Sequence, residues 1–145
     1  MSLNRAIQIA IEAHEGQKDK ADKPYITHAM RVMDRCKTED EKIVGMLHDV
    51  VEDCSAKGWT LKRLEQEGFA RNILLAIEAI SQNVGESKAD YIGRVKMNAL
   101  ATQVKINDLE DNMDIRRLPT ITPDSLDRLN RYLVTYRELL NHSQV

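Results

Sequence analysis

The chain of 145 residues has few aromatic side chains, two cysteines and no long hydrophobic run. Aromatics make up 4% of it, and the alternating β-branched runs that build strands are almost absent. Cys36 and Cys54 are too few for a disulfide framework, and nothing in the sequence suggests export. No apolar stretch approaches the roughly 18 residues that a membrane-spanning helix needs. We therefore expect a soluble, cytoplasmic protein that does not bind membranes.

An excess of charge of one sign is also lacking. The chain has 21 Lys and Arg against 23 Asp and Glu, a formal net charge of −2. This balance argues against an acidic disordered chain and against the broad basic surface that binds nucleic acid polymers. Apolar residues make up 42% of the chain, enough for one hydrophobic core, so we expect residues 1–145 to form a single domain.

Apolar residues recur instead at helical spacing along most of the chain. Leu3, Ile7 and Ile11 share one face of the first segment, and Thr38 with Glu41 reads as a capping box that opens a later helix. The sequence predicts an all-α bundle of six to eight helices. The predicted helices cover residues 3–15, 24–33, 38–53, 60–68, 69–81, 91–98, 100–117 and 124–142.

One group of polar residues interrupts the apolar pattern of the helix that begins near Thr38. The segment LHDVVED places His48 and Asp49 one turn before Glu52 and Asp53 on neighbouring stripes of the helix. Three acids this close repel one another unless protons or a cation compensate them. A divalent metal accepts imidazole and carboxylate ligands and would resolve the conflict. The alternative is a solvated polar face on an amphipathic helix.

Two more residues complete a set of four candidate ligands. His28 lies in PYITH and Asp108 in VKINDLEDN, each among apolar neighbours. By itself His28 is more typical of a hydrogen-bonded core histidine than of a metal ligand. The order His, His-Asp, Asp resembles the pattern of the HD-domain phosphohydrolase superfamily.

The resemblance extends over three motifs between Ala13 and Asn112. These motifs resemble those in the hydrolase domain of the bifunctional Rel/SpoT enzymes. The first is AHEGQ followed after six residues by PYITH, the second is LHDVVED, and the third is VKINDLEDN. They also resemble the small stand-alone SpoT homologues of metazoans, which remove the 3′-pyrophosphate of (p)ppGpp. The resemblance implies a compact HD-domain helical bundle, a divalent metal that is usually Mn²⁺, and a phosphorylated nucleotide as the small-molecule partner.

Matched motif by motif, the resemblance also implies roles for individual residues. The implied metal ligands are His28, His48, Asp49 and Asp108, and the implied catalytic pair is Glu52 and Asp53. Such a pair can orient the attacking water or move its proton, and can protonate the leaving group. The candidate substrate-binding residues are Lys20, Asn112, His14 and Lys105. The two lysines are also consistent with ordinary solvated surface.

The chain departs from the family in two places. The Arg and Ser of the family's base-binding loop are Asp19 and Ala21 here, and only Lys20 remains of its Arg-Lys-Ser motif. After Asp108 the family's HNMR is DNMD, so that Asp114 replaces a basic residue. An arginine can stack on a purine, whereas an aspartate cannot and would repel phosphates. These changes predict a different or less phosphorylated substrate.

Several functions therefore stay open at the level of sequence. A (p)ppGpp 3′-pyrophosphohydrolase is the nearest named activity, with an HD phosphatase acting on another nucleotide, such as a nucleoside monophosphate, as the alternative. A non-catalytic nucleotide-binding HD module is a third hypothesis. A zinc or redox role for the two cysteines is weaker, because they lack C-x-x-C spacing. The polar segment 82–90 is expected to be a mobile substrate lid, and the oligomeric state is open.

Overall fold

The computed structural model describes residues 2–143, and every regular element in that range is a helix. The all-α fold class is confirmed. The α-helices are α1 (Leu3–Ala13), α2 (Ile26–Arg35), α3 (Glu39–Leu47), α4 (Val50–Cys54), α5 (Leu61–Gln66), α6 (Arg71–Ile80), α7 (Lys88–Lys96), α8 (Ala99–Asn112) and α9 (Pro123–Ser143). Two short 3-10 helices, η1 (Ser55–Lys57) and η2 (Ile115–Arg117), lie between them.

Polar residues at the helix starts explain where most of these elements begin. The Thr38 hydroxyl accepts a hydrogen bond from the Glu41 amide while the Glu41 side chain returns to the Thr38 amide, which is the predicted capping box. Thr60, Ser87 and Asn98 cap α5, α7 and α8 in the same way with one side-chain acceptor each.

The helix predicted for residues 38–53 is divided in two, which is why the structure has more α-helices than expected. His48 and Asp49 form a turn between α3 and α4, and the Asp49 backbone has φ −106° and ψ −1°. In an unbroken helix adjacent side chains point about 100° apart. The turn instead allows both of these neighbours to face the same point in the molecule, as their contacts below show.

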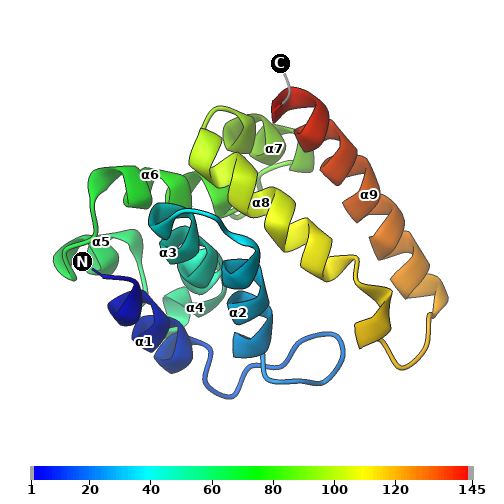
Figure 1. Ribbon diagram of the computed structural model, residues 1–145, viewed down its shortest axis with the longest axis horizontal. Helices are drawn as coiled ribbons and strands as arrows, with labels where there is room; N and C mark the ends of the chain where they lie inside the picture. The colour runs from blue at the N-terminus through cyan, green and yellow to red at the C-terminus, as the bar shows by residue number, and fades with distance from the viewer. Residues whose placement is uncertain (1, 144–145) are drawn as a thin grey trace.

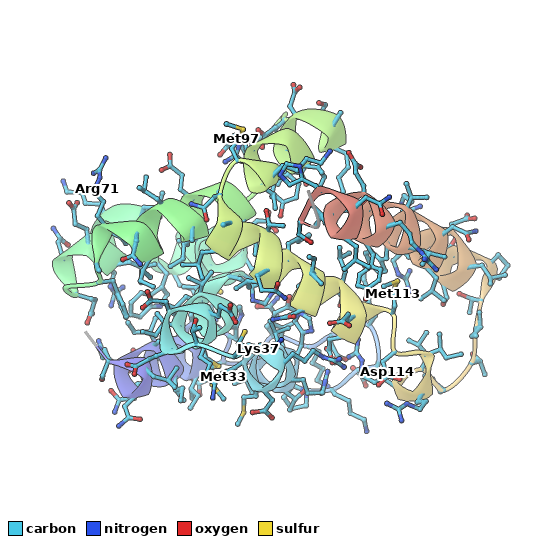
Figure 2. The ribbon with its side chains drawn as sticks, turned by 45° about the horizontal axis from the view of Figure 1, so that its top comes forward. Met33, Lys37, Arg71, Met97, Met113 and Asp114 are labelled. Carbon is cyan, nitrogen blue, oxygen red and sulfur yellow. The ribbon has the colours of Figure 1, made fainter. Side chains whose placement is uncertain are left out.

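The helix predicted for residues 100–117 is also shorter than expected, because α8 ends at Asn112. Met113 and Asp114, labelled in Figure 2, mark its end. Asp114 has an extended backbone, and its side chain accepts a hydrogen bond from the Arg116 amide, which starts η2 as a separate turn.

The core surrounds α3, which packs against α1, α2, α6 and α8. Figure 1 shows α8 crossing the middle of the molecule, with α2 and α3 on one side and α9 on the other. Met46 and Leu47 are fully buried immediately before His48. Burial of such side chains contributes about 1.5–3 kcal/mol each, so the segment that carries His48 and Asp49 is firmly anchored.

Neither a membrane span nor a reactive thiol is evident among residues 2–143. None of the helices described there is both long enough and apolar enough to cross a membrane. Cys36 and Cys54 are free and buried, and burial raises the pKa of both thiols. A raised pKa disfavours the thiolate that a zinc or redox role would require.

Candidate metal centre

The four candidate ligands come together although they lie up to 80 residues apart in sequence. His28 from α2, His48 and Asp49 from the turn after α3, and Asp108 from α8 each offer one donor atom, and these atoms lie within 4.8 Å of one another. Asp108 Oδ1 is 2.9 Å from His28 Nε2 and 3.3 Å from His48 Nε2. Asp49 Oδ2 lies 3.0 Å from His48 Nε2. The solvated polar face considered above is therefore wrong for His48, which is buried.

The ring of His48 is oriented by its own helix. His48 Nδ1 lies 2.6 Å from the carbonyl oxygen of Gly45. A carbonyl only accepts, so Nδ1 must donate its hydrogen there, and Nε2 is the nitrogen that faces the two carboxylates. Asp49 is held in turn by Tyr25, whose hydroxyl donates to Asp49 Oδ2.

The electrostatics of this cluster attract positive charge. Burial alone lowers the pKa of the His48 imidazole, but the Asp49 and Asp108 carboxylates outweigh burial and raise that pKa well above its usual range. Burial alone would raise the pKa of Asp108, but the Lys105 ammonium and the two imidazoles hold it well below its usual range. The ligand set is thus suited to protons on the imidazoles or to a divalent cation that replaces them. Two imidazoles and two carboxylates fit such a cation chemically.

The second oxygen of Asp108 is occupied by Lys105, which has a different place from the one expected. Lys105 Nζ donates to Asp108 Oδ2 at 2.9 Å, and the side chains are 14% and 5% exposed, respectively. Lys105 therefore supports a candidate ligand instead of lining the cavity described below. Asn112 is one turn further along α8 and donates to Asp108 Oδ1 at 3.1 Å, while also lining that cavity.

Glu52 and Asp53 lie at the edge of the cluster, on α4, and are exposed. Glu52 Oε1 accepts a hydrogen bond from the Gln82 amide at 2.6 Å. Burial of part of each carboxyl group, together with the nearby Asp49 charge, raises the pKa of both residues. A carboxyl group with a raised pKa can exchange a proton closer to neutral pH, which suits an acid–base role.

The segment 82–90, expected from sequence to be a mobile lid, makes several hydrogen bonds within itself and with neighbouring helices. Glu86 forms a pair of hydrogen bonds to Arg94, with a shortest separation of 2.7 Å, and accepts another from the Asn83 amide. Gln82 anchors the start of the segment to Glu52. These contacts favour a fixed turn that positions Glu52, and the segment does not line the adjoining cavity.

His14 is linked to the site through a glutamine. Its Nδ1 lies 2.8 Å from Gln17 Oε1, and Gln17 Nε2 donates to Asp53 Oδ2 at 3.1 Å. His14 is buried, its ring packs against Tyr25, and it is absent from the cavity wall. The structure therefore places His14 behind Asp53, where it supports Gln17, and His14 lines a separate hollow together with Gln17 and Lys18.

A cavity of about 470 Å³ opens beside the cluster. Its wall is formed by Gln17, Lys18, Asp19, Lys20, Tyr25, His28, Asp53, Asn112, Arg117 and Tyr132. A smaller hollow shares Lys20, Asn112 and Arg117 with it and adds Arg128 from α9. The cavity thus joins a candidate metal ligand and one acid of the Glu-Asp pair to basic side chains, an arrangement suited to a phosphate-bearing ligand.

The acidic substitution at position 19 has a structural explanation. Asp19 Oδ1 accepts hydrogen bonds from the amides of Ala21 and Lys23, at 2.9 and 3.0 Å, and so folds the loop. Its Oδ2 lies 3.2 Å from Arg117 Nη1 and 4.0 Å from Arg31 Nη2. Asp114 is likewise paired with Arg116, at 2.9 Å. Because both acids are paired with arginines, they repel phosphates less than their sequence positions suggest.

The sequence interpretation missed Asp111. It is fully buried on α8, its Oδ2 lies 2.6 Å from His28 Nδ1, and its Oδ1 lies 2.8 Å from Arg31 Nε. The available signal was its spacing of three residues from Asp108, which places both carboxylates on one face of a helix.

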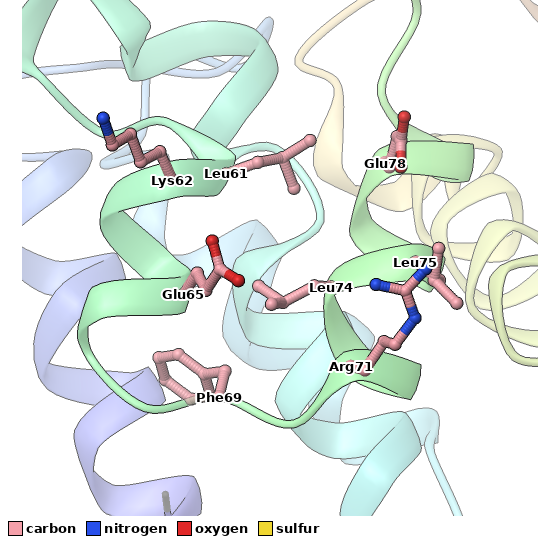
Figure 3. Close-up of a pocket in the computed structure, with 8 residues that line it drawn as sticks. All are labelled: Leu61, Lys62, Glu65, Phe69, Arg71, Leu74, Leu75 and Glu78. Atoms are coloured by element: carbon pink, nitrogen blue, oxygen red, sulfur yellow. The ribbon is translucent and has the colours of Figure 1, made fainter.

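A larger hollow of about 590 Å³ lies elsewhere, between α5 and α6. In Figure 3, Leu61 from α5 and Leu74 from α6 line it from opposite sides, and Lys62 and Arg71 carry charges at its rim. None of the candidate site residues lines it, so size alone does not identify the functional site.

The fold and the histidine–carboxylate cluster define the chain as an all-helical domain with a candidate metal centre. No protein-family model matches it. The chain is 28% identical over 155 aligned positions, covering 97% of its length, to the bifunctional (p)ppGpp synthase/hydrolase SpoT of Escherichia coli K12. It is 32% identical over 98 positions, or 65% of its length, to the chloroplast protein of Arabidopsis thaliana named GTP diphosphokinase RSH1.

Among solved structures, the chain is similar to a metazoan ortholog of SpoT that is described as hydrolysing ppGpp. The TM-score is 0.76 at 21% identity, and the match covers 97% of this chain and 84% of the other. The resemblance to the SpoT and Rel proteins predicted from the three motifs is confirmed, and the fold is that of the SpoT ortholog. The chain spans only 21% of SpoT and 10% of RSH1.

Proposed function

We propose that this chain is a metal-dependent phosphohydrolase acting on a nucleotide-like phosphate or pyrophosphate ester, most like a (p)ppGpp 3′-pyrophosphohydrolase. The observation that carries the proposal is the convergence of four donor atoms within 4.8 Å beside a cavity whose wall includes Lys18, Lys20 and Arg117. We further propose Mn²⁺ as the metal, with His28, His48, Asp49 and Asp108 as its ligands. We also propose that the protein is cytoplasmic.

The chain's own residues would divide the reaction among them. A bound divalent ion supplies Lewis acidity and lowers the pKa of a water molecule. Glu52 accepts a proton from the attacking water while the water oxygen forms a bond to phosphorus. Asp53 protonates the ester oxygen while the bond between that oxygen and phosphorus breaks. Lys20 and Arg117 bind the phosphate oxygens, and Asn112 orients both Asp108 and the ligand.

Two observations support a substrate with several phosphates. Relatives of the chain are named guanosine-3′,5′-bis(diphosphate) 3′-pyrophosphohydrolase. The pairing of Asp19 with Arg117 offsets the negative charge of Asp19, so this substitution by itself does not require a less phosphorylated substrate. The loss of the family's stacking arginine and base-contacting serine still bears on the choice of base, which the substrate panel below addresses.

The test is to incubate the purified protein with Mn²⁺ and ppGpp, and separately with a panel of nucleotides, and to follow phosphate and pyrophosphate independently. Mn²⁺-dependent release of pyrophosphate from ppGpp is expected. Release of phosphate from a nucleoside monophosphate alone would instead favour the alternative phosphatase.

A variant separates the enzyme from a non-catalytic nucleotide-binding module. Asp49→Ala is expected to abolish Mn²⁺ binding and turnover together, whereas the surface variant Asp127→Ala serves as a matched control that retains both. If Asp49→Ala lost metal but still performed the cellular role of the protein, the chain would act as a binding module.

A further inference from the structure

We propose that Asp111 is a positioning residue that fixes the ring of His28 so that its Nε2 faces Asp108 and Asp49. The inference rests on the proposed metal-dependent function and concerns a residue of the third motif to which the resemblance assigns no role. Asp111 stands where the resemblance expects the histidine of HNMR, so a carboxylate at this position is a feature of the present chain.

The geometry leaves one arrangement for the His28 ring. Asp111 Oδ2 lies 2.6 Å from His28 Nδ1, and the Asp111 side chain is fully buried. An ionised carboxylate only accepts hydrogen bonds, so Nδ1 carries the hydrogen and Nε2 is the nitrogen available to a metal. His28 Nε2 lies 2.9 Å from Asp108 Oδ1 and 3.9 Å from Asp49 Oδ2, within the candidate ligand cluster.

The two histidines are thus oriented alike by different acceptors. His48 uses the Gly45 carbonyl of its own helix, whereas His28 depends on a side chain from another helix. A carboxylate on the far nitrogen of a ligand histidine fixes the tautomer and increases its basicity toward the metal. Removal of Asp111 therefore affects one ligand selectively.

The Asp111 carboxylate is itself held by arginines. Arg31 Nε donates to Asp111 Oδ1 at 2.8 Å, and Arg35 and Arg117 approach the same carboxylate to 3.9 Å. Buried charges need such partners. These arginines hold the Asp111 carboxylate in place, so that it presents a fixed negative charge to His28 Nδ1.

The experiment measures Mn²⁺ binding directly, by the loss of the electron paramagnetic resonance signal of free Mn²⁺. Asp111→Ala is expected to raise the Mn²⁺ dissociation constant about 10- to 100-fold. The control is Glu110→Ala, which removes the same charge from the adjacent position of α8, where the Glu110 side chain contacts Tyr136. It is expected to change the Mn²⁺ dissociation constant less than about 2-fold, because Glu110 contacts no candidate ligand. Side-chain ¹H–¹⁵N spectra are expected to show a slowly exchanging Nδ1 proton on His28, lost in Asp111→Ala.

Three outcomes would be informative. A folded Asp111→Ala protein with unchanged Mn²⁺ affinity overturns the inference, even if its melting temperature falls. If Asp111→Ala does not fold, Asp111→Leu decides, because its side chain is close in size to that of aspartate and offers His28 Nδ1 no acceptor; unchanged Mn²⁺ affinity there also overturns the inference. If the wild-type protein binds no Mn²⁺, the proposed function fails, while the His28 Nδ1 proton still tests the orientation separately.

Discussion

Replacing Asp108 with alanine removes a candidate metal ligand and leaves the Lys105 ammonium without its carboxylate. The two side chains are 5% and 14% exposed and 2.9 Å apart, so the pair is almost completely buried. Breaking a buried ion pair by removing one partner costs about 3–5 kcal/mol. For a domain of this size, that loss lowers the melting temperature by about 6–20 °C.

A second substitution separates the loss of the ligand from the loss of the pair. In Lys105→Met with Asp108→Ala, neither member of the Lys105–Asp108 pair is left unpaired, and replacing a buried ion pair with apolar side chains is often close to neutral. The double variant is therefore expected to regain most of the lost stability. It should still show no response to Mn²⁺, because a candidate ligand is missing.

Thermal unfolding with and without Mn²⁺ measures both effects. A metal at 100 times its dissociation constant stabilises the wild-type protein by about 2.7 kcal/mol, or about 5–11 °C. A double variant that keeps the full wild-type shift would refute the assignment of Asp108 as a ligand. A single Asp108→Ala variant that melts within about 1 °C of wild type would refute the dependence of Lys105 on Asp108.

Three further predictions concern residues around the cluster. Because burial raises the pKa of Glu52, the folded chain holds the carboxyl proton of Glu52 more tightly than the unfolded chain does. Stability therefore falls as the pH rises from the unfolded to the folded pKa of Glu52. At pH 7 in the presence of a metal chelator, Glu52→Gln should therefore stabilise the protein, and the gain should vanish below the ordinary Glu pKa of about 4.3. Turnover should fall about 10²- to 10⁴-fold. Gln17→Ala releases Asp53 and should lower kcat about tenfold with Mn²⁺ affinity preserved. Asp19→Ala removes the acceptor of two loop amides and should cost about 1–3 kcal/mol, with a larger effect on KM than on kcat.

Thermal melts across pH, Mn²⁺ titrations and steady-state kinetics check these three expectations. For Glu52→Gln, a destabilised protein at pH 7 would contradict the sign of the pKa shift. For Gln17→Ala, a loss of metal affinity equal to the loss of kcat would show that Gln17 acts on the ligands instead of on Asp53. For Asp19→Ala, an unchanged KM would show that the loop around Lys20 does not contact substrate.

Much of the candidate centre could be predicted from sequence because its residues interrupt apolar patterns. His48 and Asp49 stand inside a run of core residues, and Asp108 enters an otherwise apolar helix face. Their grouping followed from the order of three motifs and a family resemblance. Asp111 carried no comparable signal, because an aspartate on an amphipathic helix is ordinarily a surface residue, and Lys105 was expected near the site but not as the partner of Asp108.

By itself, the sequence determined the helical class, most helix positions and the residues able to bind a metal, since these depend on local periodicity, capping and side-chain chemistry. Only the tertiary structure decided where the charges point. The packing of α2 against α8 brings Asp111 onto His28, and the fold pairs Asp19 with Arg117 across 98 residues. The physical reason is that a buried charge must find a partner wherever packing places one, and sequence spacing does not record such distant neighbours.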